Sequence, residues 1–136
     1  MIREGRPADR PAVRRLQRRL PEPEPELLDP VVGGSLLLST DEGDVVGYLL
    51  WFPGEPTYAA EVVVHPDHRR AGRARALFAE LFDRVSTGTA IELRVAAENE
   101  AAQDLYREFG FERVAVEPDA YESGPGYLLR AVVGEH

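Results

Sequence analysis

Residues 62–74 read VVVHPDHRRAGRA, an apolar run that ends at a proline and continues into a basic segment with one glycine. A short valine-rich run bounded by proline predicts a buried strand. From Arg73 onward the apolar residues recur with helical spacing, which predicts an amphipathic helix over residues 73–85. Because the first amides of a helix lack carbonyl partners, and Gly72 and Ala74 leave room, this junction predicts an anion-binding loop.

The rest of the chain alternates strand and helix patterns. A helix is predicted over residues 9–20, with Asp9 as its cap and Pro21 as its stop. The alternating prolines and glutamates of residues 21–26 predict a stiff acidic connector. Asn99 is predicted to cap a helix that ends at Gly110, and residues 121–126 are predicted as a loop. Strands are predicted at residues 2–3, 35–40, 45–52, 57–65, 90–95, 113–116 and 127–133.

Length and composition restrict the class of protein. The 136 residues suit one domain, residues 1–136, and the pattern predicts a mixed α/β sheet covered by helices. The net charge of −8 argues against general nucleic-acid binding. No apolar stretch is long enough for a membrane span and no signal peptide is recognisable, so we expect a cytoplasmic protein. With no cysteine and three histidines, no metal site is expected, although His65 and His68 have a suggestive spacing.

All 16 basic residues are arginines. Two explanations are equally compatible with an acidic, lysine-free chain. One is a halophilic source, where concentrated salt screens repulsion between like charges; the other is a GC-rich genome that favours arginine codons.

Two segments carry a family resemblance. The loop Arg69-x-x-Gly72-x-Ala74 resembles the pyrophosphate loop of the GNAT (GCN5-related) N-acetyltransferases. Residues 93–111, LRVAAENEAAQDLYREFGF, resemble a second segment of that family, in the correct order and separation. The likeness covers nearly the whole chain, which is somewhat similar to the RimI-type branch. It implies a single-domain, mixed, mostly antiparallel central sheet with splayed central strands, flanked by helices.

The resemblance implies acetyl-CoA as cosubstrate. It assigns cofactor binding to the strand, the loop and two residues downstream: Val62, Val63, Val64, Arg69, Arg70, Ala71, Gly72, Arg73, Ala74, Asn99 and Tyr106. The sequence itself adds an argument for the loop arginines, including Arg75. Cations are poorly placed at a helix N-terminus unless an anion binds there.

Three residues are candidates for catalysis. Tyr106 would protonate the departing thiolate, although it also suits a half-buried packing role. Glu61 is the first choice as general base, because an acid among valines would have a raised pKa. Glu92 is the second. RimI-type enzymes carry a base glutamate at the position of Arg94, so Glu92 either substitutes for it or pairs with Arg94 as a surface ion pair.

Two functions remain open. The first is direct acetyl transfer in a ternary complex to a primary amine: a protein N-terminus, a lysine or a small amine. The second is a non-catalytic acyl-CoA sensor. The resemblance places the acidic connector, with Leu27 and Leu28 after it, in the wall of the acceptor site, which favours a cationic acceptor. Solvation in concentrated salt would explain the same glutamates. Tyr58, Tyr121 and Tyr127 would line the acceptor pocket or pack under a loop. The expected partner is a small-molecule or peptide amine, with no nucleic acid and no membrane, and the protein is expected to be a monomer or homodimer.

Overall fold

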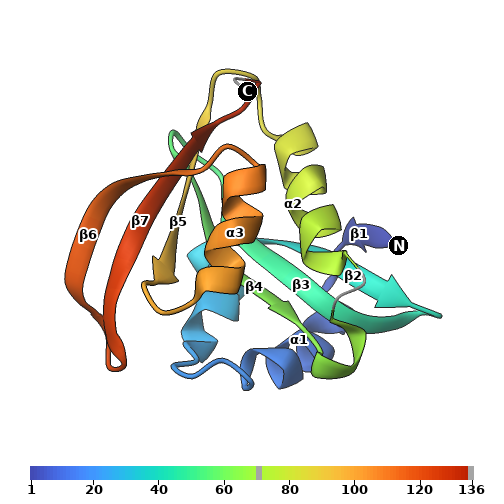
Figure 1. Cartoon of the computed structure of the whole chain (residues 1–136). Helices are drawn as coiled ribbons and strands as arrows, with labels where there is room; N and C mark the ends of the chain where they lie inside the picture. The colour runs from blue at the N-terminus through green and yellow to red at the C-terminus, as the bar shows by residue number, and fades with distance from the viewer. Residues whose placement is uncertain (70–71, 135–136) are drawn as a thin grey trace. The chain divides into compact units, whose positions relative to one another are not determined.

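The computed structural model describes residues 1–69 and 72–134. It has an α/β fold with a mixed, mostly antiparallel seven-stranded sheet, which confirms the predicted fold class; the strands follow the hydrogen-bonded order β1-β2-β3-β4-β5-β7-β6 (Figure 1). The chain forms two compact units. The first consists of Met1–Pro53 and Ala59–Arg84, and the second of Gly54–Tyr58 and the described residues from Val85 onward.

The first unit packs two helices against opposite faces of its strands. In β2, Leu38 belongs to a core cluster with Val13 and Leu16 of α1, whereas the neighbouring Ser39 accepts a hydrogen bond from Arg73 of α2. Because side chains alternate along a strand, α1 and α2 cover different faces. The elements of this unit are β1 (Ile2–Glu4), α1 (Arg10–Gln17), β2 (Ser35–Asp41), β3 (Asp44–Phe52), β4 (Thr57–Val64) and α2 (Arg73–Arg84). Of β4, only the residues from Ala59 onward belong to the first unit, and Thr57 and Tyr58 belong to the second.

Both ends of the predicted helix 9–20 are corrected. Asp9 does not cap α1; its carboxylate instead accepts hydrogen bonds from Arg3 and from the Arg6 amide at the preceding 3-10 turn, Pro7–Asp9. At the other end α1 stops at Gln17, and the next turn tightens into the bonds Arg19 N to Leu16 O and Leu20 N to Gln17 O, both 3.0 Å. The proline at position 21 disfavours helical geometry for Leu20, the residue before it, so the helix cannot reach its predicted end.

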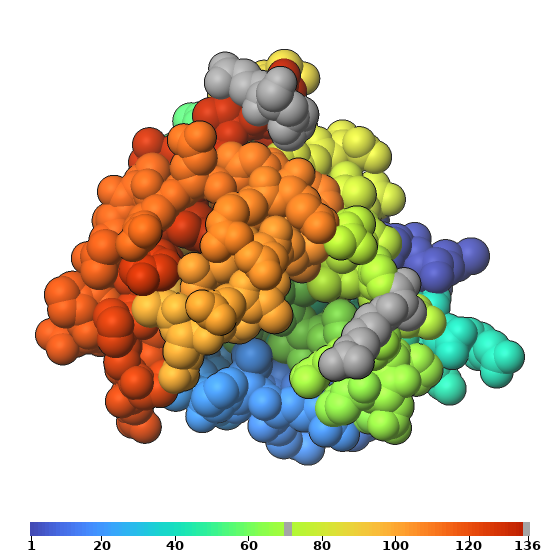
Figure 2. Space-filling model, viewed as in Figure 1, coloured from blue at the N-terminus to red at the C-terminus, as the bar shows by residue number. Residues whose placement is uncertain are grey.

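The connector after α1 is exposed over residues 21–26, as predicted for its charge and its prolines. Figure 2 shows residues 20–30, in light blue, at the surface of the molecule. The last two residues of the connector begin a short 3-10 helix, Pro25–Leu28, and a second one follows at Pro30–Val32. Leu28 anchors the segment, because it is buried in the same core cluster as Val13 and Leu16.

The second unit is built from β5 (Ala90–Ala96), α3 (Glu100–Glu108), β6 (Glu112–Tyr121) and β7 (Gly124–Val132). β7 pairs antiparallel with both β5 and β6, and β5 pairs in parallel with Thr57 and Tyr58 of β4. The predicted loop 121–126 is shorter than expected: β6 extends to Tyr121 and β7 begins at Gly124, so only the turn at residues 122–123 connects the two strands. The sequence predicted a shorter strand, residues 113–116, because Pro118 argues against a central strand. β6 is an edge strand, where a proline is tolerated.

Candidate active site

Glu61 of β4 is held by two side chains of the first unit. The Tyr48 hydroxyl on β3 donates a hydrogen bond of 3.0 Å to Glu61 Oε1. The Gln17 amide nitrogen, from the end of α1, lies 3.2 and 3.3 Å from the two carboxylate oxygens. Tyr48 is fully buried and Gln17 is 2 % exposed, while Glu61 itself is half-buried. The acid expected among the valines of β4 therefore lies in a polar niche built by three elements.

Opposing effects set the acidity of this carboxyl. Burial raises the pKa of Glu61 above its usual value, and the hydrogen bonds from Tyr48 and Gln17 lower it. The negative charges of Glu24 and Glu26, on the connector, raise it further. The net result is a raised pKa, which makes the carboxylate a stronger base than a solvated glutamate. Burial, followed by the charge of Glu61, also raises the pKa of Tyr48, so its phenol stays protonated and remains a donor.

The glycine of the predicted phosphate loop has the backbone that the loop requires. Gly72 has φ +72°, a conformation that favours glycine, and α2 begins at the next residue. The bond from Ala76 N to Gly72 O, 2.9 Å, closes the first turn of α2. The amides at the N-terminus of α2, beginning with that of Arg73, suit a phosphate group. Two predicted loop residues, Arg70 and Ala71, lie outside the described residues.

Two arginines of the predicted phosphate loop, Arg69 and Arg73, donate hydrogen bonds to residues at the ends of β4 and β2. Arg69 Nε donates to Val64 O at 3.1 Å. Arg73 turns back to the end of β2, where it donates to Ser39 Oγ at 3.0 Å and to the Thr40 carbonyl at 3.3 Å. Its guanidinium also lies 3.7 Å from Asp41. The Arg73 side chain thus ties α2 to β2, and its backbone amide is the part that suits phosphate.

The valines of the opening stretch end β4, and Val63 is buried. Their predicted backbone contact with the cofactor stays a prediction, as does that of Asn99. The second expectation for Asn99 is confirmed: its side chain accepts a hydrogen bond of 3.2 Å from Ala102 N and caps α3. Gly110, with φ +85°, ends the same helix as predicted.

Tyr106 lies on the inner side of α3. It is 6 % exposed, and its ring meets the ring of Phe111 edge to face at a centroid distance of 5.8 Å. Burial, with a smaller contribution from Tyr121, raises the pKa of Tyr106 to about 12. The phenol is therefore protonated throughout the neutral range, as a proton donor must be. The packing contact and the protonated state are compatible with both roles considered for this residue.

The expected ion pair between Glu92 and Arg94 is wrong. Glu92 pairs instead with Arg130 on β7, its direct cross-strand neighbour, at 2.6 Å. Arg94 donates to Glu117 at 2.8 Å and to the Tyr58 hydroxyl at 3.1 Å. Cross-strand neighbours lie closer than residues two apart on one strand, which explains the exchange of partners. Glu92 as a base stays a prediction, with its carboxylate already paired.

The other predicted pocket and metal residues have partners within their own units. Tyr58 lies beneath the guanidinium of Arg94 as well as accepting its hydrogen bond, and Tyr127 lies 4.3 Å beneath that of Arg113. His65 accepts a hydrogen bond from the Asp67 amide, and its ring meets that of His68 at 5.9 Å. Across residues 1–69 and 72–134 there is no group of three or more histidines and acids that could hold a metal ion.

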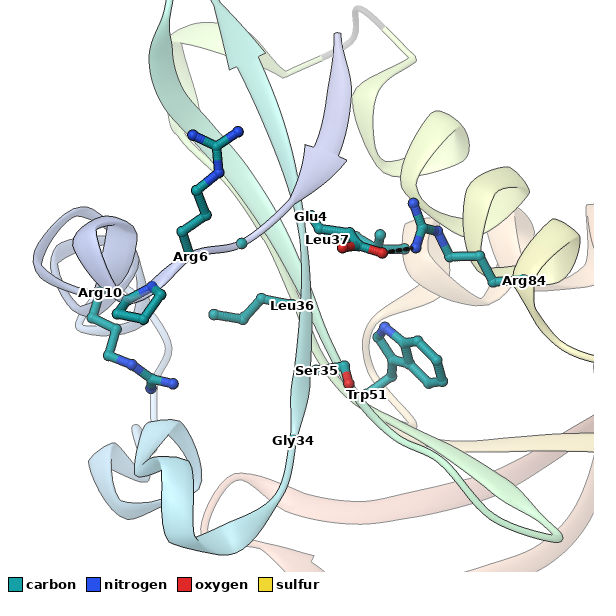
Figure 3. A pocket seen from close by; sticks show the side chains of 11 residues that line it. Glu4, Arg6, Arg10, Gly34, Ser35, Leu36, Leu37, Trp51 and Arg84 are labelled. Atoms are coloured by element: carbon teal, nitrogen blue, oxygen red, sulfur yellow. Dashed lines mark hydrogen bonds and ion pairs between the residues drawn. The ribbon is translucent and has the colours of Figure 1, made fainter.

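A cavity of about 290 Å³ opens at the end of β1, beside β2 and Trp51 (Figure 3). Its walls carry three arginines, yet Arg84 is paired with Glu4 and Glu80, and Arg10 donates to the Leu28 carbonyl. The buried Trp51 Nε1 has no hydrogen-bond partner in the part of the chain that the structure describes. None of the three predicted catalytic residues lines this cavity.

Sequence reasoning did not find Gln17 and Tyr48 as site residues. Each is separated from Glu61 along the chain, by 44 and 13 residues respectively, and neither has a local pattern that signals a polar role. For Gln17 the sequence offers one indirect signal, because the helix periodicity places this polar residue on the face that points into the core.

Among the described residues, no helix has the length and apolar character needed to cross a membrane.

Comparison with known proteins identifies the family. The family model described as Acetyltransferase (GNAT) family matches residues 7–111. An uncharacterised Mycobacterium leprae protein, ML0378, is 41 % identical over 71 residues, which are 51 % of this chain and 20 % of that protein. The chain thus matches about a fifth of the length of this curated relative.

Solved structures of similar fold cover the whole chain. The ribosomal-protein-S18-alanine N-acetyltransferase of Escherichia coli superposes with a TM-score of 0.86 at 22 % identity, over 100 % of this chain and 95 % of that one. The putative acetyltransferase yncA of Salmonella typhimurium, solved with acetyl-CoA, gives a TM-score of 0.78 at 21 % identity with the same coverage. At these identities the likeness shows the fold.

Proposed function

Because the chain belongs to the GNAT acetyltransferase family, which uses acetyl-CoA, we propose that it transfers an acetyl group from acetyl-CoA to a primary amine by direct transfer in a ternary complex. The observation that carries the proposal is the half-buried Glu61, with a raised pKa and two hydrogen-bond donors. An acid in such a niche suits proton transfer better than a solvated surface glutamate.

The cosubstrate supplies an activated acetyl thioester. The backbone amides at the start of α2 and Gly72 suit its pyrophosphate, and Asn99 with the end of β4 is proposed to contact its pantetheine arm. Glu61 is proposed to accept a proton from the acceptor ammonium, directly or through water, so that the amine lone pair can attack the acetyl carbonyl carbon. As the carbon–sulfur bond breaks, Tyr106 is proposed to give its proton to the departing sulfur. The acylated nitrogen loses its second proton to water, and Tyr106 regains a proton from water, which leaves the neutral amide and the free thiol.

The charges around Glu61 support a cationic acceptor. Glu24 and Glu26 act on Glu61 strongly enough to raise its pKa, so three carboxyl groups share one electrostatic environment. A positively charged amine would relieve their mutual repulsion when it binds. The exposed position of the connector leaves these carboxylates accessible to a peptide or a polyamine.

The test is a panel of cationic, neutral and acidic amines and peptides, with release of free thiol as the readout. We expect acetylation of cationic acceptors, and a loss of 10²–10⁴-fold in kcat/KM for Glu61→Gln with little change in acetyl-CoA affinity. Glu92→Gln is the matched control, because its carboxylate is paired with Arg130. Equal loss in both variants would contradict the assignment of Glu61, and equal rates on neutral and cationic acceptors would contradict the acceptor class.

The alternative is an acyl-CoA sensor with no transfer activity. Arg94 keeps this alternative open, because it occupies the position where RimI-type enzymes carry a base and it is fixed by Glu117 and Tyr58. Tight binding of acetyl-CoA without thiol release on any acceptor would favour the sensor. Failure to bind acetyl-CoA at all would overturn both functions.

A further inference from the structure

Gln17 connects two parts of the proposed site that are far apart in sequence. Its side-chain nitrogen lies 3.2 Å from Glu61 Oε1 and 2.9 Å from the carbonyl oxygen of Glu24 on the connector. An amide NH2 has two hydrogens, so a single nitrogen can donate to both acceptors at once. Gln17 is 2 % exposed and its position at the end of α1 is fixed by the core contacts of Val13 and Leu16.

Tyr48, on β3, contacts the same carboxylate. Its hydroxyl, 3.0 Å from Glu61 Oε1, belongs to a side chain that is fully buried. The phenol is enclosed by the core cluster around it and donates its hydrogen to Glu61. Gln17 and Tyr48 together restrain a carboxylate that is itself only half-buried.

Resting on the function proposed above, we propose that Tyr48 and Gln17 are positioning residues for Glu61, and that Gln17 also fixes the acidic connector, which carries the acceptor-recognising Glu24 and Glu26. The two residues therefore have separable roles. Tyr48 acts on the base alone, whereas Gln17 acts on both the base and the wall that recognises the acceptor.

The groups that act on the Glu61 carboxyl come from three elements, and they predict how its pKa changes when one of them is removed. Tyr48 on β3 and Gln17 on α1 stabilise the ionised carboxylate, while Glu24 and Glu26 on the connector oppose it. Removing either donor leaves burial and repulsion opposed by the other donor alone, so the carboxyl should hold its proton to a higher pH. A hydrogen bond to a charged group corresponds to a shift of about one pKa unit.

The experiment compares Tyr48→Phe and Gln17→Met with the wild type. The acid limb of kcat/KM should move up by about one pH unit in each, which lowers the rate about tenfold on the acid side. KM for a cationic acceptor should rise severalfold in Gln17→Met and stay unchanged in Tyr48→Phe. The free acceptor amine has the same pKa in all assays. A difference between variants in the pH of the acid limb of kcat/KM therefore reports a group of the protein.

Thr57→Val is the matched control, since Thr57 is also a buried polar residue of β4, but its hydroxyl donates to the Gly54 carbonyl rather than to Glu61. We expect it to lower Tm without moving the limb. A structural role alone for Tyr48 and Gln17 would give the same result as this control, and would overturn the proposal.

A second measurement does not require turnover. Side-chain carboxyl NMR with ¹³C-labelled glutamate, with Glu61→Gln used to assign the signal, reports the pKa of Glu61 directly. We expect that pKa to rise in Tyr48→Phe and in Gln17→Met, even if no acceptor is acetylated. If the pKa of Glu61 rises in the variants but the wild type acetylates no acceptor, the proposed function is contradicted and the positioning roles are not. If the wild type is active but the pKa of Glu61 is the same in the variants, the positioning roles are contradicted and the proposed function is not.

Discussion

Glu61 Oε1 and the Tyr48 hydroxyl lie 3.0 Å apart, although one belongs to a half-buried acid and the other to a fully buried phenol. The contact keeps a carboxylate in a place that disfavours its charge. Function and stability are therefore expected to oppose each other at this position.

Glu61→Gln should raise Tm at pH 8 while it abolishes most activity. The folded-state pKa of Glu61 lies above its unfolded value, so the charge penalty is present above the folded pKa and disappears as pH falls through it. Thermal unfolding at pH 8 and at pH 4 checks this. We expect a gain of a few degrees at pH 8 and almost none at pH 4; a uniform loss at both values would contradict it.

Tyr106→Phe should lower kcat by about 10²-fold and leave acetyl-CoA affinity little changed, because the ring packing against Phe111 is retained and only the proton donor is removed. With a pKa of about 12, the wild-type phenol should cause no alkaline loss of activity below about pH 10. Single-turnover rates and a binding titration provide the test. An unchanged kcat would leave Tyr106 with its packing role.

Arg73→Ala should reduce stability more than cofactor binding. The side chain lost is the one that donates to Ser39 and to the Thr40 carbonyl, whereas the backbone amide at the start of α2 remains. We expect a loss of about 1–3 kcal/mol in the free energy of unfolding and a change of less than tenfold in the Kd for acetyl-CoA. A large rise in Kd with unchanged Tm would instead assign the guanidinium to the cofactor.

Asp9→Asn should destabilise the protein by about 1–2 kcal/mol at pH 7. Arg3 donates two hydrogen bonds of 2.8 Å to this carboxylate, and with the Arg6 amide they lower the pKa of Asp9 to about 2. Because the folded pKa is depressed, the stabilisation is present above the unfolded value and is lost as pH falls towards 2.

Urea unfolding at pH 7 and at pH 2.5 measures that effect. Asp104→Asn is the control, because the Asp104–Arg107 pair is exposed on both sides and should contribute almost nothing. Equal changes in the two variants would contradict the importance of the Arg3–Asp9 pair.

The sequence by itself determined what local periodicity and capping can encode. The valine run, the helix with Leu77 and Leu81 buried, the Asn99 cap and the Gly110 stop are all in the structure as predicted, because each depends on residues within one turn or one strand. The same locality made Glu61 recognisable, since an acid within an apolar strand is an anomaly that is visible without tertiary structure.

The tertiary structure decided which side chains meet. Glu92 pairs with Arg130 rather than Arg94, the Arg73 side chain turns towards Ser39, and Gln17 and Tyr48 reach Glu61 from two other elements. Strand register and helix packing place these partners, and both follow from burying apolar surface over the whole unit rather than from any short segment. Glu61 is thus recognisable from its neighbours in the sequence, whereas its hydrogen-bond donors, Gln17 and Tyr48, are brought to it only by the tertiary structure.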